Sequence, residues 1–111
     1  MNEWVKSFQG GITVCDEHGI VLEMNEAAEK SFEKDGGRAL IGKNLLDCHP
    51  PEARQKLEEL MRERKANVYT IEKQGRKKLI YQTPWYQDGR YAGFIELSLV
   101  IPFEMPHFVR D

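Results

Sequence analysis

The chain has little of what several specialised classes of protein need. Its 111 residues contain only two cysteines, Cys15 and Cys48, and no CxxC pair or zinc-ligand spacing. A disulfide framework and a zinc fold are therefore excluded, and both cysteines are expected to be reduced thiols. No apolar run approaches the length of a membrane span, and the N-terminus has no basic region followed by an apolar segment. We expect a cytoplasmic protein that does not contact a membrane.

The chain also lacks an excess of positive charge and lacks the common catalytic motifs. Its 16 basic and 18 acidic residues give a formal net charge of −2, so no polycationic surface for direct nucleic-acid binding is expected. No Gly-x-Ser-x-Gly elbow, P-loop or His-Glu-x-x-His motif occurs. Asp47 beside His49 has the spacing of an orienting acid–base pair, but no nucleophile accompanies it. We expect no enzymatic activity.

The most informative segment begins as a β-hairpin at Ile12. The turn cluster Asp16-Glu17-His18-Gly19 separates two apolar runs, and Gly19 can supply the positive φ that a hairpin turn often needs. On the far side, Ile20, Leu22 and Met24 alternate with Val21 and Glu23. This alternation predicts a second strand whose buried face carries Ile20, Leu22 and Met24.

A short helix is predicted directly after the hairpin. Asn25 stands at the N-cap position, where its side-chain oxygen can accept a hydrogen bond from an amide of the first turn. Ala28 and Phe32 are four residues apart and form an apolar stripe that is expected to pack against the sheet.

The rest of the chain predicts one longer helix and three more strands. The helix follows Pro50-Pro51 and carries the apolar stripe Ala53, Leu57, Leu60 and Met61. The strands are expected at Asn67–Lys73, Lys78–Trp85 and Tyr91–Ile101, with Pro84 at an edge or bulge. This order predicts an α+β fold, in which a five-stranded antiparallel sheet carries short helices on one face.

The two ends of the chain are expected to lie outside that domain, which we assign to residues 12–101. Residues 1–11 form an amphipathic segment, and Trp4, Val5 and Phe8 share its apolar face. These three residues either fold onto the domain or, as we expect, form the contact of a homodimer. Residues 102–111 contain Pro102 and Pro106 and are expected to be a tail or linker.

Three ordered motifs make residues 12–100 resemble a PAS domain. The first PAS hairpin and helix have the form ϕ-ϕ-x-D-x-x-G-x-ϕ-x-x-x-N, and Asp16, Gly19, Asn25, Ala27, Ala28 and Phe32 stand in the matching places. Residues 42–47 are similar to the turn before the long PAS helix, and residues 88–93 to the D-G-x-ϕ-x-G start of the last strand.

The resemblance implies a PAS-like (profilin-like) sheet whose inner face and short helices enclose a small ligand or cofactor. It implies a sensory domain in signal transduction that relays ligand binding through dimer or partner contacts. The alternative is a ligand-free dimerisation and interaction module. In either case the output lies outside this chain, in a partner or an output domain, such as a histidine kinase of a two-component system or a transcription regulator. Fold alone does not decide between the two.

The site residues expected from the resemblance surround the string Cys48-His49-Pro50-Pro51. The candidate cavity is lined by His49, Cys48, Phe32, Leu45, Leu57, Met61 and Tyr81. Two interpretations of His49 stay open: it is an axial heme ligand, or it is a turn residue whose imidazole caps a backbone group. The ligating His of heme PAS domains usually lies further along the helix, which counts against the first. No other metal site is expected. Light-sensing relatives carry a reactive cysteine where this chain has Leu45, so no covalent flavin adduct is expected.

Overall fold

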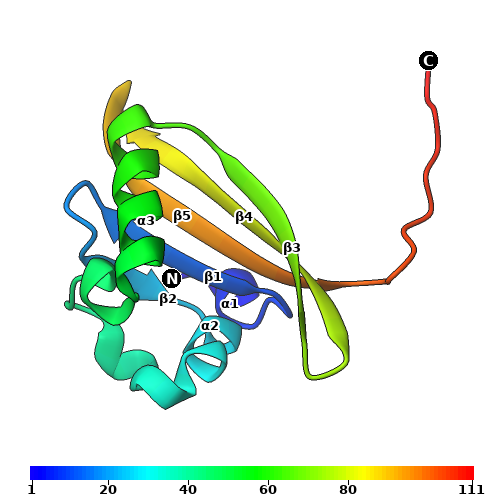
Figure 1. Cartoon of the computed structure of the whole chain (residues 1–111), viewed down its shortest axis with the longest axis horizontal. Helices are drawn as coiled ribbons and strands as arrows, with labels where there is room; N and C mark the ends of the chain where they lie inside the picture. The colour runs from blue at the N-terminus through cyan, green and yellow to red at the C-terminus, as the bar shows by residue number, and fades with distance from the viewer.

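The sheet is the framework of the molecule, and it brings the two ends of the domain together. The structure is a computed structural model that describes residues 1–111, apart from the side chain of Cys48. Five antiparallel strands lie in the order β2-β1-β5-β4-β3, and the helices between β2 and β3 gather on one face of the sheet (Figure 1). The strands are β1 (Gly11–Asp16), β2 (Val21–Met24), β3 (Asn67–Lys73), β4 (Arg76–Gln87) and β5 (Arg90–Ile101). The α+β prediction is confirmed.

The helices are mostly short, as expected for the segment between β2 and β3. The α-helices are α1 (Glu3–Lys6), α2 (Glu26–Ser31) and α3 (Pro51–Glu63). Three 3₁₀ turns join α2 to α3, namely η1 (Glu33–Asp35), η2 (Gly37–Leu40) and η3 (Leu45–Cys48). The described part of the chain holds no helix long and apolar enough to cross a membrane.

The first hairpin has the predicted turn but not the predicted face. Gly19 has a φ of +88°, and Asp16 Oδ1 accepts hydrogen bonds from the amides of His18 and Ile20 at 2.9 and 3.0 Å. The register shifts between Val14 and Cys15 of β1, so simple alternation fails along β2. Val21 is therefore buried, whereas Leu22 is 42% exposed. The prediction that Leu22 faces the core is wrong.

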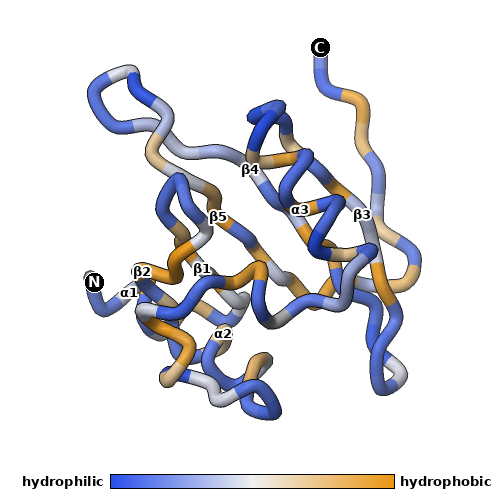
Figure 2. The backbone as a smooth tube through the Cα atoms, turned by 60° about the vertical axis from the view of Figure 1, so that its left-hand side comes forward, coloured by the Kyte–Doolittle hydropathy of each residue, from blue (hydrophilic) through white to orange (hydrophobic). Residues whose placement is uncertain are grey.

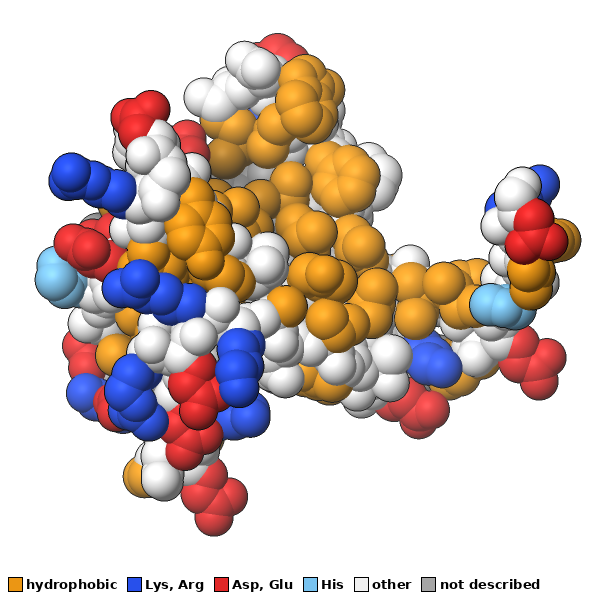
Figure 3. Space-filling view, turned by 90° about the horizontal axis from the view of Figure 1, so that it is seen from above, with side chains coloured by type: hydrophobic (Ala, Val, Ile, Leu, Met, Phe, Trp, Pro, Cys, Tyr) orange, Lys and Arg blue, Asp and Glu red, His pale blue; other side chains and the backbone are white. Residues whose placement is uncertain are grey.

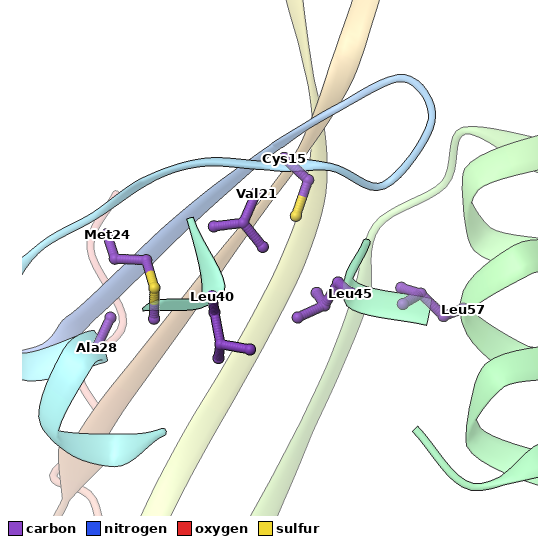
Figure 4. Close-up of a cluster of buried hydrophobic side chains, with 7 residues drawn as sticks. All are labelled: Cys15, Val21, Met24, Ala28, Leu40, Leu45 and Leu57. Carbon is purple, nitrogen blue, oxygen red and sulfur yellow. The ribbon is translucent and has the colours of Figure 1, made fainter. Parts of the chain in front are cut away.

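The core lies between the inner face of the sheet and the helices. Figure 4 shows Cys15, Val21 and Met24 from the sheet pointing toward Ala28, Leu40, Leu45 and Leu57 from the helical layer. The α3 stripe is confirmed, since Leu57 and Leu60 are buried and the polar residues of α3 face solvent. Pro51 is the first residue of α3, where its missing amide costs no hydrogen bond.

The three closing strands have two distinct faces. In β5, Phe94, Glu96 and Ser98 face the helices, and Ile95, Leu97 and Leu99 face the other way, which we call the outer face. Figure 2 shows hydrophobic stretches along the strands and hydrophilic residues at the hairpin ends. Pro84 lies beyond Gln82, the last residue of β4 that pairs in register with β3, so it occupies an edge as predicted.

The ends of the chain leave several apolar side chains uncovered. Trp4 of α1 is 72% exposed and Phe8 is 44% exposed. Residues 102–111 leave β5 as an extended tail that projects from the domain (Figure 1). In the view from above, hydrophobic side chains form a continuous area that reaches the base of this tail (Figure 3).

Candidate functional site

A row of polar side chains crosses the inner face of the sheet, where a purely structural core would be apolar. Thr13 of β1 stands opposite Glu96 of β5, Glu96 stands opposite Gln82 of β4, and Gln82 stands opposite Asn67 of β3. We call these four residues the polar ladder. Because directly opposed residues share one face, strand pairing alone places all four side chains on the inner face of the sheet.

Hydrogen bonds join three members of the polar ladder in one direction. Asn67 Nδ2 donates to Gln82 Oε1 at 3.0 Å, and Gln82 Nε2 donates to Glu96 Oε1 at 3.0 Å. A carboxylate only accepts, so Glu96 fixes the orientation of the Gln82 amide, and Gln82 in turn fixes Asn67. Glu96 is thus the terminal acceptor of a chain that ties together three strands.

His49 faces the polar ladder from the helical layer. It follows η3, and its Nδ1 lies 2.7 Å from the carbonyl oxygen of Leu45. A carbonyl oxygen only accepts, so Nδ1 carries the proton in this contact. In the neutral ring Nε2 is then left with an open lone pair. This is the geometry that the backbone-capping interpretation of His49 predicts.

Three members of the polar ladder, Thr13, Gln82 and Glu96, line one small cavity of about 20 Å³ together with His49. Its lining consists of Thr13, Cys15, Gly19, Leu45, His49, Leu57, Met61, Gln82, Phe94, Ile95 and Glu96. Four of the residues predicted for the cavity, namely Leu45, His49, Leu57 and Met61, are thus brought together. Phe32 packs against the same core but does not line this cavity. The prediction for Cys48 concerns a side chain outside the described residues.

Tyr81 does not belong with the other predicted cavity residues. Its neighbours Ile80 and Gln82 face the helices, so Tyr81 points to the outer face, where it stands opposite Leu97 and is 39% exposed. We correct its assignment accordingly. The sequence did not settle which face of β4 is the inner one, because aromatic and apolar residues occur on both sides of the strand.

Burial sets the protonation behaviour of this site. Burial raises the pKa of Glu96, and the hydrogen bond from Gln82 and the nearby His49 oppose that shift. Burial, with the charges of Glu96 and Asp16 adding to it, raises the pKa of the Cys15 thiol to about 12. Cys15 is therefore a neutral lining residue at physiological pH and not a nucleophile.

The residues present do not fit a heme. His49 Nε2 is a suitable iron ligand in its chemistry, but a cavity of about 20 Å³ has room for one water-sized group. A porphyrin is many times larger and would have to displace α3 from the sheet. Among the described residues no group of three or more His, Cys, Asp or Glu side chains is arranged to hold a metal ion.

The residues of the polar ladder stand out in the sequence only when their strands are compared with one another. Glu96 is the only acidic residue in β5, and Gln82 and Asn67 interrupt the apolar positions of β4 and β3. Each residue alone resembles an ordinary solvent-facing polar residue. Their importance follows from the register of three separate strand pairs, which local sequence does not specify.

Solved structures show the same fold at low sequence identity. The C-terminal domain of a protein from Streptococcus mutans matches with a TM-score of 0.69 and 20% identity, covering 86% of this chain and 78% of that chain. The PAS domain of BvgS from Bordetella pertussis matches with a TM-score of 0.65 and 21% identity, covering 88% and 81%. The PAS domain of the histidine kinase ThkA matches with a TM-score of 0.62 and 22% identity, covering 81% and 97%.

The sequence itself carries the family assignment. No curated protein matches the chain. The model of the PAS fold family matches residues 5–101, which is most of the sequence and includes all five strands. The chain therefore belongs to the PAS fold family.

Proposed function

We propose that this chain is a sensory PAS domain that detects a small ligand at the polar ladder and relays its binding to a partner protein or output domain. The observation that carries the proposal is the placement of Glu96 and His49 on opposite walls of one small cavity whose other lining residues are mostly apolar. Burying a carboxylate costs free energy that apolar residues at the same positions would not cost. Such residues are expected where a site needs them for binding.

A route for the relay runs along β5. Glu96 lies five residues before the end of this strand at Ile101, and the tail starts at Pro102. A ligand that binds Glu96 changes the charge on the carboxylate that accepts from Gln82, and Gln82 is bonded in turn to Asn67. Binding therefore changes the hydrogen bonds between β3, β4 and β5. We propose that the tail serves as the linker that passes this change to a cytoplasmic output, as in a histidine kinase.

The proposal predicts that a small molecule stabilises the protein and perturbs the polar ladder. Purified protein should be dialysed against fractions of a small-metabolite extract, and its melting temperature and backbone amide shifts recorded. At least one fraction should raise the melting temperature and move the amide signals of Gln82 and Glu96 together with those near Ile101. His49→Ala should abolish both effects. If no fraction moves these signals, the sensory proposal is wrong.

A second candidate function is a ligand-free dimerisation module. The observation that favours it is that the cavity beside Glu96 and His49 measures only about 20 Å³, while the outer face and residues 1–11 leave large apolar side chains exposed. At the Cβ position of Gly10, side-chain atoms of Phe8 and Leu99 both lie close, so the N-terminal segment extends the outer face. We propose that a second copy of the chain covers this surface. In a two-fold symmetric dimer the same apolar patch of both copies would meet, and each would cover the other.

The dimer proposal predicts a specific effect of two substitutions. Trp4→Ala with Phe8→Ala should shift the protein toward monomer and weaken self-association at least about tenfold, because exposed aromatic residues dominate such contacts. Sedimentation equilibrium measures this directly. The control is Phe108→Ala with Val109→Ala, which removes comparably exposed apolar side chains from the tail. If the Trp4→Ala, Phe8→Ala variant dimerises as tightly as the wild type, these residues do not form the contact. If the wild-type protein is a monomer, the dimer proposal is wrong.

A further inference from the structure

The hydrogen bonds of the polar ladder leave an unpaired acceptor at the cavity. Asn67 donates to Gln82, and Gln82 donates to Oε1 of Glu96, which is the only oxygen of this carboxylate in the chain of hydrogen bonds. The other carboxylate oxygen, Oε2, accepts no hydrogen bond from any side chain or backbone group that the structure describes. An ionised carboxylate has no donor of its own. The cavity therefore has a partly unpaired, negatively charged acceptor on its sheet side.

The opposite wall adds a second acceptor. Since His49 uses Nδ1 to donate to the carbonyl of Leu45, the neutral ring offers the lone pair of Nε2 on its other side. His49 and Glu96 line the same cavity without forming an ion pair among the described residues. A group placed between them meets acceptors on both sides, and the Thr13 hydroxyl can either donate or accept.

The size and the lining of the cavity further restrict the kind of group that can bind in it. About 20 Å³ holds one water-sized group, which is also the size of an ammonium head. The remaining walls are mainly apolar, with Leu45, Leu57, Met61 and Phe94 among them. Such walls cannot solvate a bare inorganic cation, and the carboxylate repels an anion. A cation that carries its own N–H donors satisfies both conditions.

We propose that this cavity binds a primary ammonium group, with Glu96 Oε2 and His49 Nε2 accepting its N–H donors. The group is either free ammonium or the head of a small primary amine. This inference rests on the proposed sensory function and names the chemical class of its ligand. Binding replaces the water that otherwise solvates the carboxylate and pairs a buried charge with an opposite one.

Binding of an ammonium group in this cavity is expected to weaken at low pH. The titratable groups that face Glu96 are His49 from the helical layer, Cys15 from β1 and Tyr69 from β3. Cys15 and Tyr69 have raised pKa values and stay neutral near pH 7, so they do not compete. A proton that binds to Glu96 removes the negative charge that holds the cation, so binding is lost. Because burial raises the pKa of Glu96, this loss begins at a higher pH than it does for an exposed carboxylate.

The test compares small probes at pH 7.5 and equal ionic strength. The probes are ammonium chloride, methylammonium chloride, tetramethylammonium chloride, sodium chloride and sodium acetate. Ammonium or methylammonium should raise the melting temperature in a saturable way and move the amide signals of Thr13, Gln82 and Glu96. Tetramethylammonium, which has no N–H donor, should not, nor should sodium or acetate. A stronger effect of ammonium identifies the free ion as the ligand, and a stronger effect of methylammonium identifies an amine head.

Two variants locate the binding site. Glu96→Gln should weaken ammonium-type binding at least about tenfold, while its amide oxygen can still accept from Gln82 and preserve the fold. Glu72→Gln, on the exposed surface of β3, is the matched control and should bind as the wild type does. Binding that survives Glu96→Gln, or an acetate effect without an ammonium effect, overturns the ammonium inference. The metabolite experiment then still decides the sensory function, since it does not depend on the class of ligand.

Discussion

Replacing Asn25 with alanine is expected to lower the free energy of unfolding by about 3–5 kcal/mol, a large share of what a domain of this size has. Asn25 is completely buried and makes four hydrogen bonds. Its Oδ1 accepts from the amides of Ile12 and Ala28 at 2.9 and 3.0 Å. Its Nδ2 donates to the carbonyls of Val5 and Gly10 at 3.1 and 2.8 Å. Alanine leaves four backbone groups without this partner where little water can replace it.

Asn44→Ala is the matched control for this effect. Asn44 also caps a helical turn, because its Oδ1 accepts from the amide of Leu46 at 2.9 Å, but its second bond, to the carbonyl of His18, is exposed. It should cost about 1 kcal/mol, the usual value for a lost N-cap. Urea denaturation followed by circular dichroism measures both variants. Equal losses in the two proteins would mean that the four buried bonds do not hold the fold together.

A third variant separates the two roles of Asn25. Asn25→Asp keeps the acceptor for Ile12 and Ala28 but, when ionised, presents an oxygen to the carbonyls of Val5 and Gly10. At pH 7 it should therefore be about as unstable as the alanine variant. A loss much smaller than that of alanine would show that the bonds to residues 1–11 contribute little.

Asn25 also shows how far sequence alone leads. Its position after an alternating run was enough to predict the N-cap, because capping depends on neighbours within three residues. The bonds from Nδ2 to Val5 and Gly10 were not predictable, since they depend on how the N-terminal segment folds back over the hairpin. The same limit applies to Leu22, whose face was decided by a register shift in the partner strand β1.

The residues of the candidate site also fall into those that the sequence could predict and those that it could not. His49 and the apolar α3 residues were predictable, since they belong to one continuous segment with a recognisable helical stripe. Glu96 was not, because its meaning depends on standing opposite Thr13 and Gln82 in two other strands. The misplaced Tyr81 has the same cause, since only the strand pairing reveals which face of β4 is the inner one.

Replacing Gly93 with alanine is expected to cost about 4 kcal/mol and to separate β5 from β1 at this point. Gly93 has a φ of +150°, and a Cβ there would collide with the carbonyl oxygen of Cys15 and lie 2.7 Å from the carbonyl carbon of Asp16. These are backbone atoms of a paired strand, so they cannot move aside as a flexible side chain would. This is the physical reason for a glycine at the end of the motif Asp88–Gly93.

The same glycine lets Trp85 reach β1. Trp85 and Asp16 stand opposite Gly93 on its two sides, and the indole Nε1 donates to the carbonyl of Cys15 at 2.9 Å. With no side chain at position 93, the indole crosses β5 to an acceptor two strands away. Alanine at this position is therefore expected to break the Trp85 bond as well as the strand pairing. The tryptophan fluorescence of the folded variant should shift accordingly.

Gly75→Ala separates this collision from the ordinary cost of a positive φ. Gly75 has a φ of +74°, but no atom lies within 4 Å of the place that a Cβ would take, so its replacement should cost only about 1–2 kcal/mol. Urea denaturation compares the two variants, and hydrogen exchange of the β1 and β5 amides shows where the structure opens. Faster exchange should appear at Cys15 and Phe94 in the Gly93 variant alone. If both variants lose the same stability, the close approach of β1 to Gly93 is not what the fold requires, and only the backbone conformation matters at this position.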